Sequence, residues 1–191
     1  MKSSSSPDSN RGDRRIAFSA MLIALCAVII SIYEGYSNRK HARLSVRPLV
    51  TISGAVNENG SGWKLGNAGL GPALVRWFEV SVDGRPVRNW LEFGQAVGLP
   101  PAVQYRYWVP QRATAFPPQE PRELFWVQPG PADQVLRSTQ AKITMRMCYC
   151  SMYDECWLAT GGPNVQPYQS CPELPTVVFT AHRPDTSTRQ P

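Results

Sequence analysis

Histidine is scarce in this chain of 191 residues, which contains only His41 and His182. A nucleophilic Ser–His or Cys–His pair needs a histidine beside a strand-borne nucleophile. His41 instead follows an apolar run, and His182 stands near a polar C-terminus. Asp154 and Glu155 are adjacent acids in a loop-like stretch, where we expect solvated turn residues rather than an acid–base pair. We therefore expect no catalytic residue and no cofactor, with an enzyme that uses Asp154 or Glu155 as an alternative.

Two familiar motifs are missing as well. The chain has no C-x-x-C, so it lacks a thioredoxin-like redox motif and the paired knuckles of a strong zinc site. The stretch N-A-G-L-G-P-A precedes a strand rather than a helix and lacks the Lys of a P-loop, which argues against a phosphate cradle. We expect a structural turn there, because Asn67, Gly69 and Gly71 adopt positive φ easily and Pro72 fixes the start of the next strand.

Basic residues do not form a stripe with interleaved aromatics. The net charge is +6, of which residues 1–44 contribute +4 and residues 45–191 contribute +2. This distribution argues against nucleic acid as a partner. Positive charge around one short apolar segment indicates a membrane surface instead.

Residues 16–33, IAFSAMLIALCAVIISIY, form an uncharged apolar run. As a helix this run is about 27 Å long, close to the thickness of a hydrocarbon core. A cleaved signal peptide has a shorter apolar region and a small-residue cleavage site, which the following EGYSNRKHARLS lacks. We therefore expect a transmembrane helix over 16–33 with the lipid bilayer as its partner, between a disordered polar tail (1–15) and a charged helical stalk (34–45).

The orientation of this helix follows from the cysteines rather than from the basic residues. Four Lys or Arg precede the run and four follow it closely, so the positive-inside rule does not decide. Cys148, Cys150, Cys156 and Cys171 form an even, clustered set that is typical of an oxidising compartment. We expect the N-terminus in the cytoplasm and the C-terminal domain outside. The alternative is a cytoplasm-facing, membrane-tethered domain with reduced or zinc-binding cysteines.

From Val46 onward, short β-branched segments alternate with turn signals such as Asp83-Gly84. The expected strands cover residues 48–56, 62–65, 73–82, 87–90, 103–109, 123–128, 141–151, 156–160 and 176–181, with short helices at 89–97 and 132–137. Such a series predicts an all-β domain, an immunoglobulin-like β-sandwich, over 46–182. A disordered tail, 183–191, is expected to follow.

The stretch CYCSMYDECW, which begins at Cys148, concentrates cysteine, aromatic and acidic residues. On a strand, Cys148 and Cys150 project from one face, and the tyrosine between them projects from the other. A bridge from Cys150 to Cys156 closes a five-residue loop, and Cys148 is then placed to reach Cys171. A Cys148–Cys150 bridge is disfavoured because adjacent same-face positions are badly aimed, and the crossed pairing stays open. No metal site is expected.

Met152, Tyr153 and Trp157 bring large apolar side chains to the same stretch. Exposed clusters of such residues mark interfaces. These three are candidates for contact with a protein partner, and the alternative is that they close the core of the domain.

Three stretches carry a family resemblance: S-I-Y-E-G-Y-x-N-R-K-H-x-R-L-S-V-R-P after the apolar run, N-x-G-x-G-P-A before a strand, and C-Y-C-S…C-W. Together they resemble a group of bacterial single-pass membrane proteins with no assigned function. The resemblance implies a bacterial, envelope-anchored β domain, which places the anchor in the inner membrane. Because no catalytic set is visible, we expect a membrane-anchored binding or scaffolding module with its domain in the periplasm.

Overall fold

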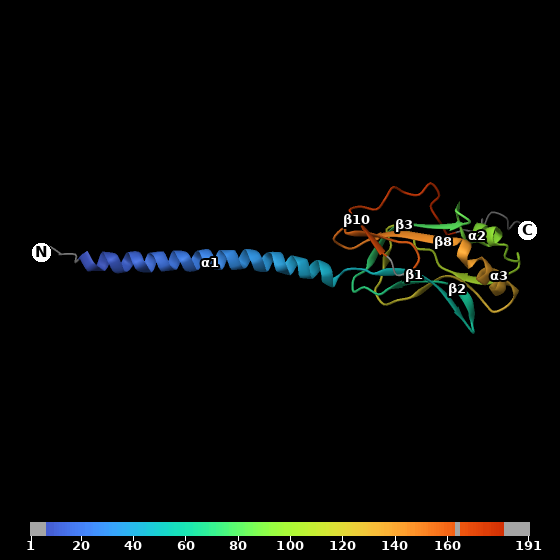
Figure 1. Ribbon diagram of the computed structural model, residues 1–191, viewed down its shortest axis with the longest axis horizontal. Coiled ribbons are helices and arrows are strands. Elements are labelled where there is room, and N and C mark those ends of the chain that lie inside the picture. Colours follow the sequence, from blue (N-terminus) through green and yellow to red (C-terminus); the bar gives the residue numbers. More distant parts are fainter. Residues whose placement is uncertain (1–6, 163–164, 182–191) are drawn as a thin grey trace, which may run out of the picture. The chain divides into compact units, whose positions relative to one another are not determined.

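The computed structural model describes residues 7–162 and 165–181 (Figure 1). The chain divides after Leu44 into two compact units, a helical one and a β-rich one. The expected tail over 183–191 lies outside the described residues, as does the first part of the expected N-terminal tail.

The helical unit consists of α1 (Pro7–Ser45), whose last residue lies beyond the division. It begins at Pro7 rather than at Ile16, so residues 7–15 are helical instead of forming a disordered tail. The large apolar side chains between Ile16 and Tyr33 are all more than half exposed. By length and composition, α1 is long and apolar enough to cross a membrane.

The β-rich unit contains two antiparallel sheets. In order across the first sheet lie β1 (Val50–Asn57), β2 (Gly60–Asn67), β7 (Arg122–Val127) and β5 (Tyr105–Tyr107). In order across the second lie β10 (Val165–Tyr168), β9 (Cys156–Ala159), β8 (Ile143–Cys150), β3 (Ala73–Val82) and β4 (Arg85–Val87), and β6 (Ala115–Phe116) pairs with the start of β3. The remaining elements are α2 (Trp90–Val97), α3 (Pro131–Thr139) and a 3₁₀ turn, η1 (Gln140–Lys142). The expectation of a β-rich domain behind one apolar helix is confirmed.

The β3–β4 hairpin forms where the sequence places it. Asp83 has φ 48° and Gly84 has φ 75°, so both residues of the turn lie in the left-handed region. A two-residue hairpin turn with positive φ matches the twist of its strands, and Asp-Gly adopts it with little steric cost.

The expected strand over 176–181 is wrong. This segment forms no ladder, although Phe179 N–H donates to the carbonyl of Phe78 at 3.1 Å and Thr180 N–H to that of Arg88 at 2.8 Å. Phe179 is buried against the ring of Phe78. The apolar pattern of the segment therefore reflects the burial of one anchor residue rather than strand pairing.

A tryptophan on α2 fills the space between the sheets. Asn89 caps this helix by accepting a hydrogen bond from Glu92 N–H, and Gly98 ends it at φ 80°. The ring of Trp90 lies 5.0 Å from that of Phe125 on β7 and 6.5 Å from that of Phe78 on β3. One helix thus packs against the inner faces of both sheets.

An ion pair within α3 fixes a buried carboxylate at the start of that helix. Asp133 is 5% exposed and lies 2.8 Å from the guanidinium of Arg137, one turn later. The hydrogen bond from Arg137 lowers the pKa of Asp133 below its ordinary value, although burial acts in the opposite direction. The pair stabilises the folded state only while the carboxylate is ionised.

Asp133→Asn should therefore lower the free energy of unfolding at pH 7 by about 1–2 kcal/mol, since it removes a charge-assisted hydrogen bond. A carboxyl whose pKa is depressed by folding contributes stability above its unfolded pKa of about 3.9, and this contribution is lost as the pH falls through the folded pKa. Urea unfolding at pH 7 and pH 3 measures both effects. Asp83→Asn, at an exposed pair with Lys142, is the control and should change stability little. A deficit in Asp133→Asn that persists unchanged at pH 3 would contradict this account.

Candidate functional site

Both distinctive sequence stretches, N-A-G-L-G-P-A and CYCSMYDECW, lie at one end of the second sheet. Leu74, next to the start of β3, pairs with Cys150, the last residue of β8. The turn 68–72 before β3 and the loop 151–155 after β8 therefore emerge together. We call the segment 46–49, this turn and this loop the hairpin end of the domain.

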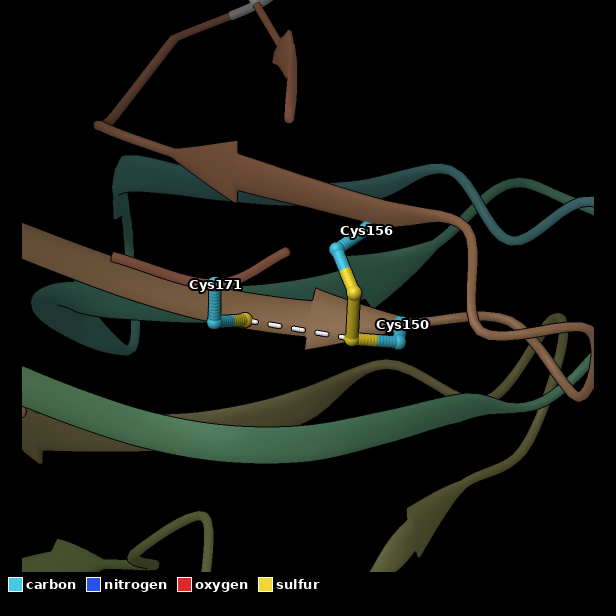
Figure 2. Close-up of side chains that lie close together, drawn as sticks. All are labelled: Cys150, Cys156 and Cys171. Carbon is cyan, nitrogen blue, oxygen red and sulfur yellow. Dashed lines mark hydrogen bonds between the residues drawn. A yellow bond between two sulfur atoms is a disulfide. The ribbon is translucent and has the colours of Figure 1, made fainter. Parts of the chain in front are cut away.

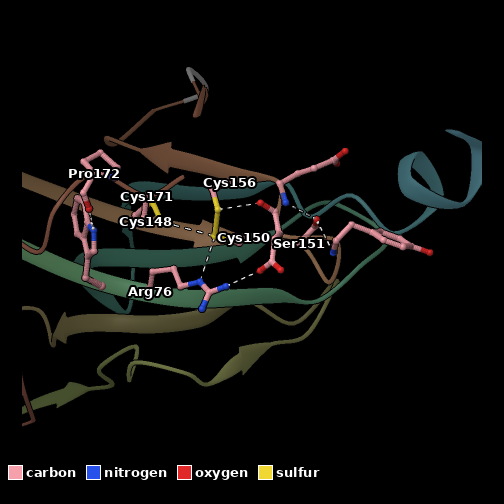
Figure 3. Close-up of a disulfide and its surroundings, with 11 residues drawn as sticks. Arg76, Cys148, Cys150, Ser151, Cys156, Cys171 and Pro172 are labelled. Atoms are coloured by element: carbon pink, nitrogen blue, oxygen red, sulfur yellow. Dashed lines mark hydrogen bonds and ion pairs between the residues drawn. A yellow bond between two sulfur atoms is a disulfide. The ribbon is translucent and has the colours of Figure 1, made fainter. Parts of the chain in front are cut away.

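Two disulfide bridges lie at the hairpin end (Figure 3). Cys148 is bonded to Cys171, with Cα atoms 5.9 Å apart. Cys150 is bonded to Cys156, its direct register partner on β9. Cys148 and Trp77 share a buried cluster on the outer face of the sheet, against which Cys171 packs. One bridge thus holds the segment around Cys171 against the second sheet, and the other joins the end of β8 to the start of β9.

Tyr149 projects to the opposite face, as the alternation along the strand predicts. It is fully buried in the core between the sheets, and its ring stacks on that of Trp157 with centroids 5.8 Å apart. Its hydroxyl accepts a hydrogen bond from Val50 N–H at 3.1 Å. Burial raises the pKa of Tyr149, while the Val50 hydrogen bond and Arg47 oppose the rise. Tyr149 therefore ties β8 to the start of β1.

The loop 151–155 is shaped by a buried serine. Ser151 is 0% exposed, and its hydroxyl oxygen accepts hydrogen bonds from Tyr153 N–H at 3.2 Å and Glu155 N–H at 3.3 Å. Ser151 N–H donates to the carbonyl of Glu155 at 2.7 Å, and Asp154 has φ 58°. These bonds fix the loop as a tight turn that closes over the Cys150–Cys156 bridge.

Arg76 on β3 joins this loop to the bridge beneath it (Figure 3). Its Nη2 lies 2.8 Å from Asp154 Oδ1, and its Nε donates to Cys150 Sγ at 3.3 Å. Both side chains of the ion pair are substantially exposed, so solvent screens the pair and its contribution to stability is small. Its effect is to place a positive charge beside one sulfur atom.

The three expected contact residues differ in exposure. Met152 is 61% exposed and Tyr153 is 48% exposed at the tip of the loop. Trp157 is 5% exposed, stacks on Tyr149 and lies under the guanidinium of Arg47 at 5.3 Å. Trp157 therefore closes the core, and its expected role as a contact is wrong because strand alternation turns its side chain inward.

Leu70 is a surface residue that sequence reasoning missed. It is 67% exposed in the turn 68–72, at the same end of the sheet as Met152. The sequence signal for this exposure is a large apolar residue that stands between two glycines in a turn rather than on the face of a strand. Leu70, Met152 and Tyr153 are the exposed large apolar residues on these two turns, and we call them the apolar tip.

Asn67 organises the turn from a buried position. It is 2% exposed, and its Oδ1 accepts hydrogen bonds from Leu49 N–H at 3.0 Å and Gly69 N–H at 3.1 Å. Its Nδ2 donates to the carbonyl of Gly71 at 2.9 Å and to that of Phe116 at 3.3 Å. One amide thus holds together the segment 46–49, the turn and β6.

The reason expected for the glycines of this turn is wrong. Asn67, Gly69 and Gly71 are not among the described residues that have positive φ. A Cβ on Gly71 would lie 1.8 Å from the carbonyl oxygen of Val46, and one on Gly69 would lie 2.3 Å from that of Arg47. The glycines are needed because the backbone of the segment 46–49 passes directly against them.

Gly71→Ala should therefore lower the free energy of unfolding by about 2 kcal/mol or more, since backbone must shift to admit the methyl group. Gly66→Ala is a matched control in β2, because its Cβ would meet only Thr51 Oγ1 at 3.5 Å. Chemical denaturation of both variants gives the comparison. Equal stability of the two variants would show that the close approach does not constrain residue 71.

The sulfur atoms of Cys150, Cys156 and Cys171 all lie within 4.8 Å of one another (Figure 2). A zinc site needs thiolates, and in the bridged state these sulfurs are committed to disulfide bonds.

Comparison of the chain with family models, curated proteins and solved structures finds no match. The geometry of the hairpin end is therefore the basis for assigning a function.

Proposed function

We propose that the chain is a single-pass, non-catalytic binding module of the bacterial cell envelope, with its β domain in the periplasm. The apolar tip is its contact surface, and the partner is a protein. The single observation that carries this proposal is the exposure of Leu70, Met152 and Tyr153 on turns that a disulfide and hydrogen bonds to the buried Ser151 and Asn67 hold in place.

The anchor and the compartment are supported by two separate features. α1 has the length and composition to cross a bilayer, and its apolar side chains are exposed along the candidate span. Four cysteines lie at bonding distance in two bridges, an arrangement that persists in oxidising compartments such as the periplasm. Two antiparallel sheets support an immunoglobulin-like sandwich as the framework that presents the tip.

A preorganised loop suits binding because little conformational entropy is lost when it meets a partner. Methionine and tyrosine are favoured at protein interfaces. Asp154 at the tip is 83% exposed in its side chain, and it lies next to Glu155. The carboxylate of Asp154 is paired with Arg76, so the exposed surface offered to a partner is chiefly the apolar side chains. These favour a protein partner that offers an apolar pocket.

Site-specific photocrosslinking in intact bacterial cells tests this contact. A photoreactive residue at Met152 should give a discrete protein adduct, whereas the same residue at Val56, which is 51% exposed on β1, should not. Leu70→Asp should weaken the Met152 adduct about tenfold or more, because a charge in an apolar contact costs over 1 kcal/mol. The melting temperature of the Leu70→Asp protein should match that of the unsubstituted protein.

Three outcomes would overturn the proposed contact. They are adducts to lipid only, the same protein adducts from Met152 and Val56, and a Met152 adduct that Leu70→Asp leaves unchanged. Mass spectrometry of the adduct identifies the crosslinked species and separates the first outcome from the others.

A further inference from the structure

The two disulfide bridges lie in van der Waals contact with each other. Cys171 Sγ lies 3.8 Å from Cys150 Sγ, which belongs to the other bridge, and Figure 2 marks this approach with a dashed line. We propose that the four cysteines form an internal disulfide-exchange site, which accepts electrons from an external dithiol at Cys171 and passes them to the Cys150–Cys156 bridge.

Accessibility sets the point of attack. Cys148, Cys150 and Cys156 are 0%, 1% and 5% exposed, whereas Cys171 is only partly buried. An attacking thiolate must reach a disulfide sulfur directly, so Cys171 Sγ is the sulfur that a dithiol meets first. The Cys148–Cys171 bridge is therefore reduced before the Cys150–Cys156 bridge.

The first step reduces the outer bridge. A thiolate of the dithiol bonds to Cys171 Sγ, the bond from Cys171 to Cys148 breaks, and Cys148 keeps the electron pair and takes a proton. The second thiol of the reductant then attacks the reductant sulfur held on Cys171. This closes the reductant's own disulfide, which has lost two electrons, and releases Cys171 as a thiolate.

The second step transfers the bridge within the domain. Once it is released from Cys148, the Cys171 side chain turns to bring its thiolate in line with the Cys150–Cys156 bond, because the three sulfurs are not collinear while both bridges are closed. The thiolate attacks Cys150 Sγ, a Cys150–Cys171 bond forms, and the Cys150–Cys156 bond breaks. Cys156 keeps the electron pair and takes a proton. The domain has one disulfide bond both before and after this step, so its overall oxidation state does not change. The product has one bridge, Cys150–Cys171, and two thiols, at Cys148 and Cys156.

Arg76 supplies the electrostatic support for this transfer. Its Nε is 3.3 Å from Cys150 Sγ, the central atom of the three sulfurs between which the bond moves. Negative charge is shared across these sulfurs during exchange, and a neighbouring guanidinium stabilises it. Asp154 holds the guanidinium in place at 2.8 Å.

Transfer removes the bridge at the base of the loop 151–155. In the starting state, Cys150–Cys156 joins the residues that flank this loop. After transfer, Cys150 is bonded to Cys171 instead, and no covalent bond joins the start of β9 to β8. The site therefore couples the reduction state of an external dithiol to the shape of the hairpin end. The exchange itself does not depend on the proposed partner.

Two serine variants of the full-length protein test the exchange, because both break the same bridge but leave different free thiols. Cys148→Ser leaves Cys171, which is 3.8 Å from Cys150 Sγ. Cys171→Ser leaves Cys148, which is fully buried and outside the group of three close sulfurs. Each protein is unfolded at acidic pH to stop exchange, alkylated, and mapped by mass spectrometry.

The digestion must cut between the cysteines. Trypsin has no site between Arg146 and Arg183, so one tryptic peptide would carry all four cysteines. Cleavage by chymotrypsin after Tyr149, Tyr153 and Trp157 separates them.

In Cys148→Ser, alkyl label should appear on both Cys171 and Cys156, together with a Cys150–Cys171 linked peptide. Label on Cys156 should exceed that in Cys171→Ser by about tenfold or more, since only one variant has a thiolate in reach. In the unsubstituted protein, one equivalent of dithiothreitol should give alkylated Cys148 and Cys156. The proposal fails if Cys148→Ser is alkylated on Cys171 alone. It also fails if alkylation of the unsubstituted protein after dithiothreitol treatment labels the two cysteines of one original bridge. The unsubstituted protein keeps the test decisive should either variant fold poorly.

Discussion

The hairpin end depends on four sulfur atoms that join three segments of chain. The Cys150–Cys156 bridge ties the end of β8 to the start of β9, and Cys148–Cys171 holds a later segment on the outer face of the same sheet. That segment also accepts one hydrogen bond from Trp77, to the carbonyl of Pro172. Each bridge contributes about 2–4 kcal/mol, mainly by restricting the unfolded chain. The position of the loop 151–155 follows from these constraints.

Strand periodicity and turn chemistry made much of this fold predictable. The segment 73–82 forms a paired strand as expected, with one register shift between Val75 and Trp77, and Asp83-Gly84 adopts the turn its residue types favour. The shared face of Cys148 and Cys150, opposite Tyr149, also followed from the two-residue period. In these cases the conformation depends on residues that are neighbours in the chain, so the sequence alone predicts it.

The features that could not be predicted arise from contacts between distant segments. Gly69 and Gly71 look like residues chosen for positive φ, but they are needed because residues 46–49 pass against them. The approach of Cys171 to Cys150 has no signal in their spacing, since it depends on how a segment without ladder pairing crosses a sheet. The exposure of Leu70 and the burial of Trp157 were likewise decided by tertiary packing.

The account of function depends on the cysteines being oxidised in the cell, which places the domain outside the cytoplasm. Acid quenching of cells, followed by alkylation in denaturant and peptide mapping, tests this most directly. We expect no label on Cys148, Cys150, Cys156 or Cys171 without reductant, and label on all four after reduction. Label on all four without reductant would contradict both the bridges and the periplasmic location, and would favour the cytoplasm-facing alternative.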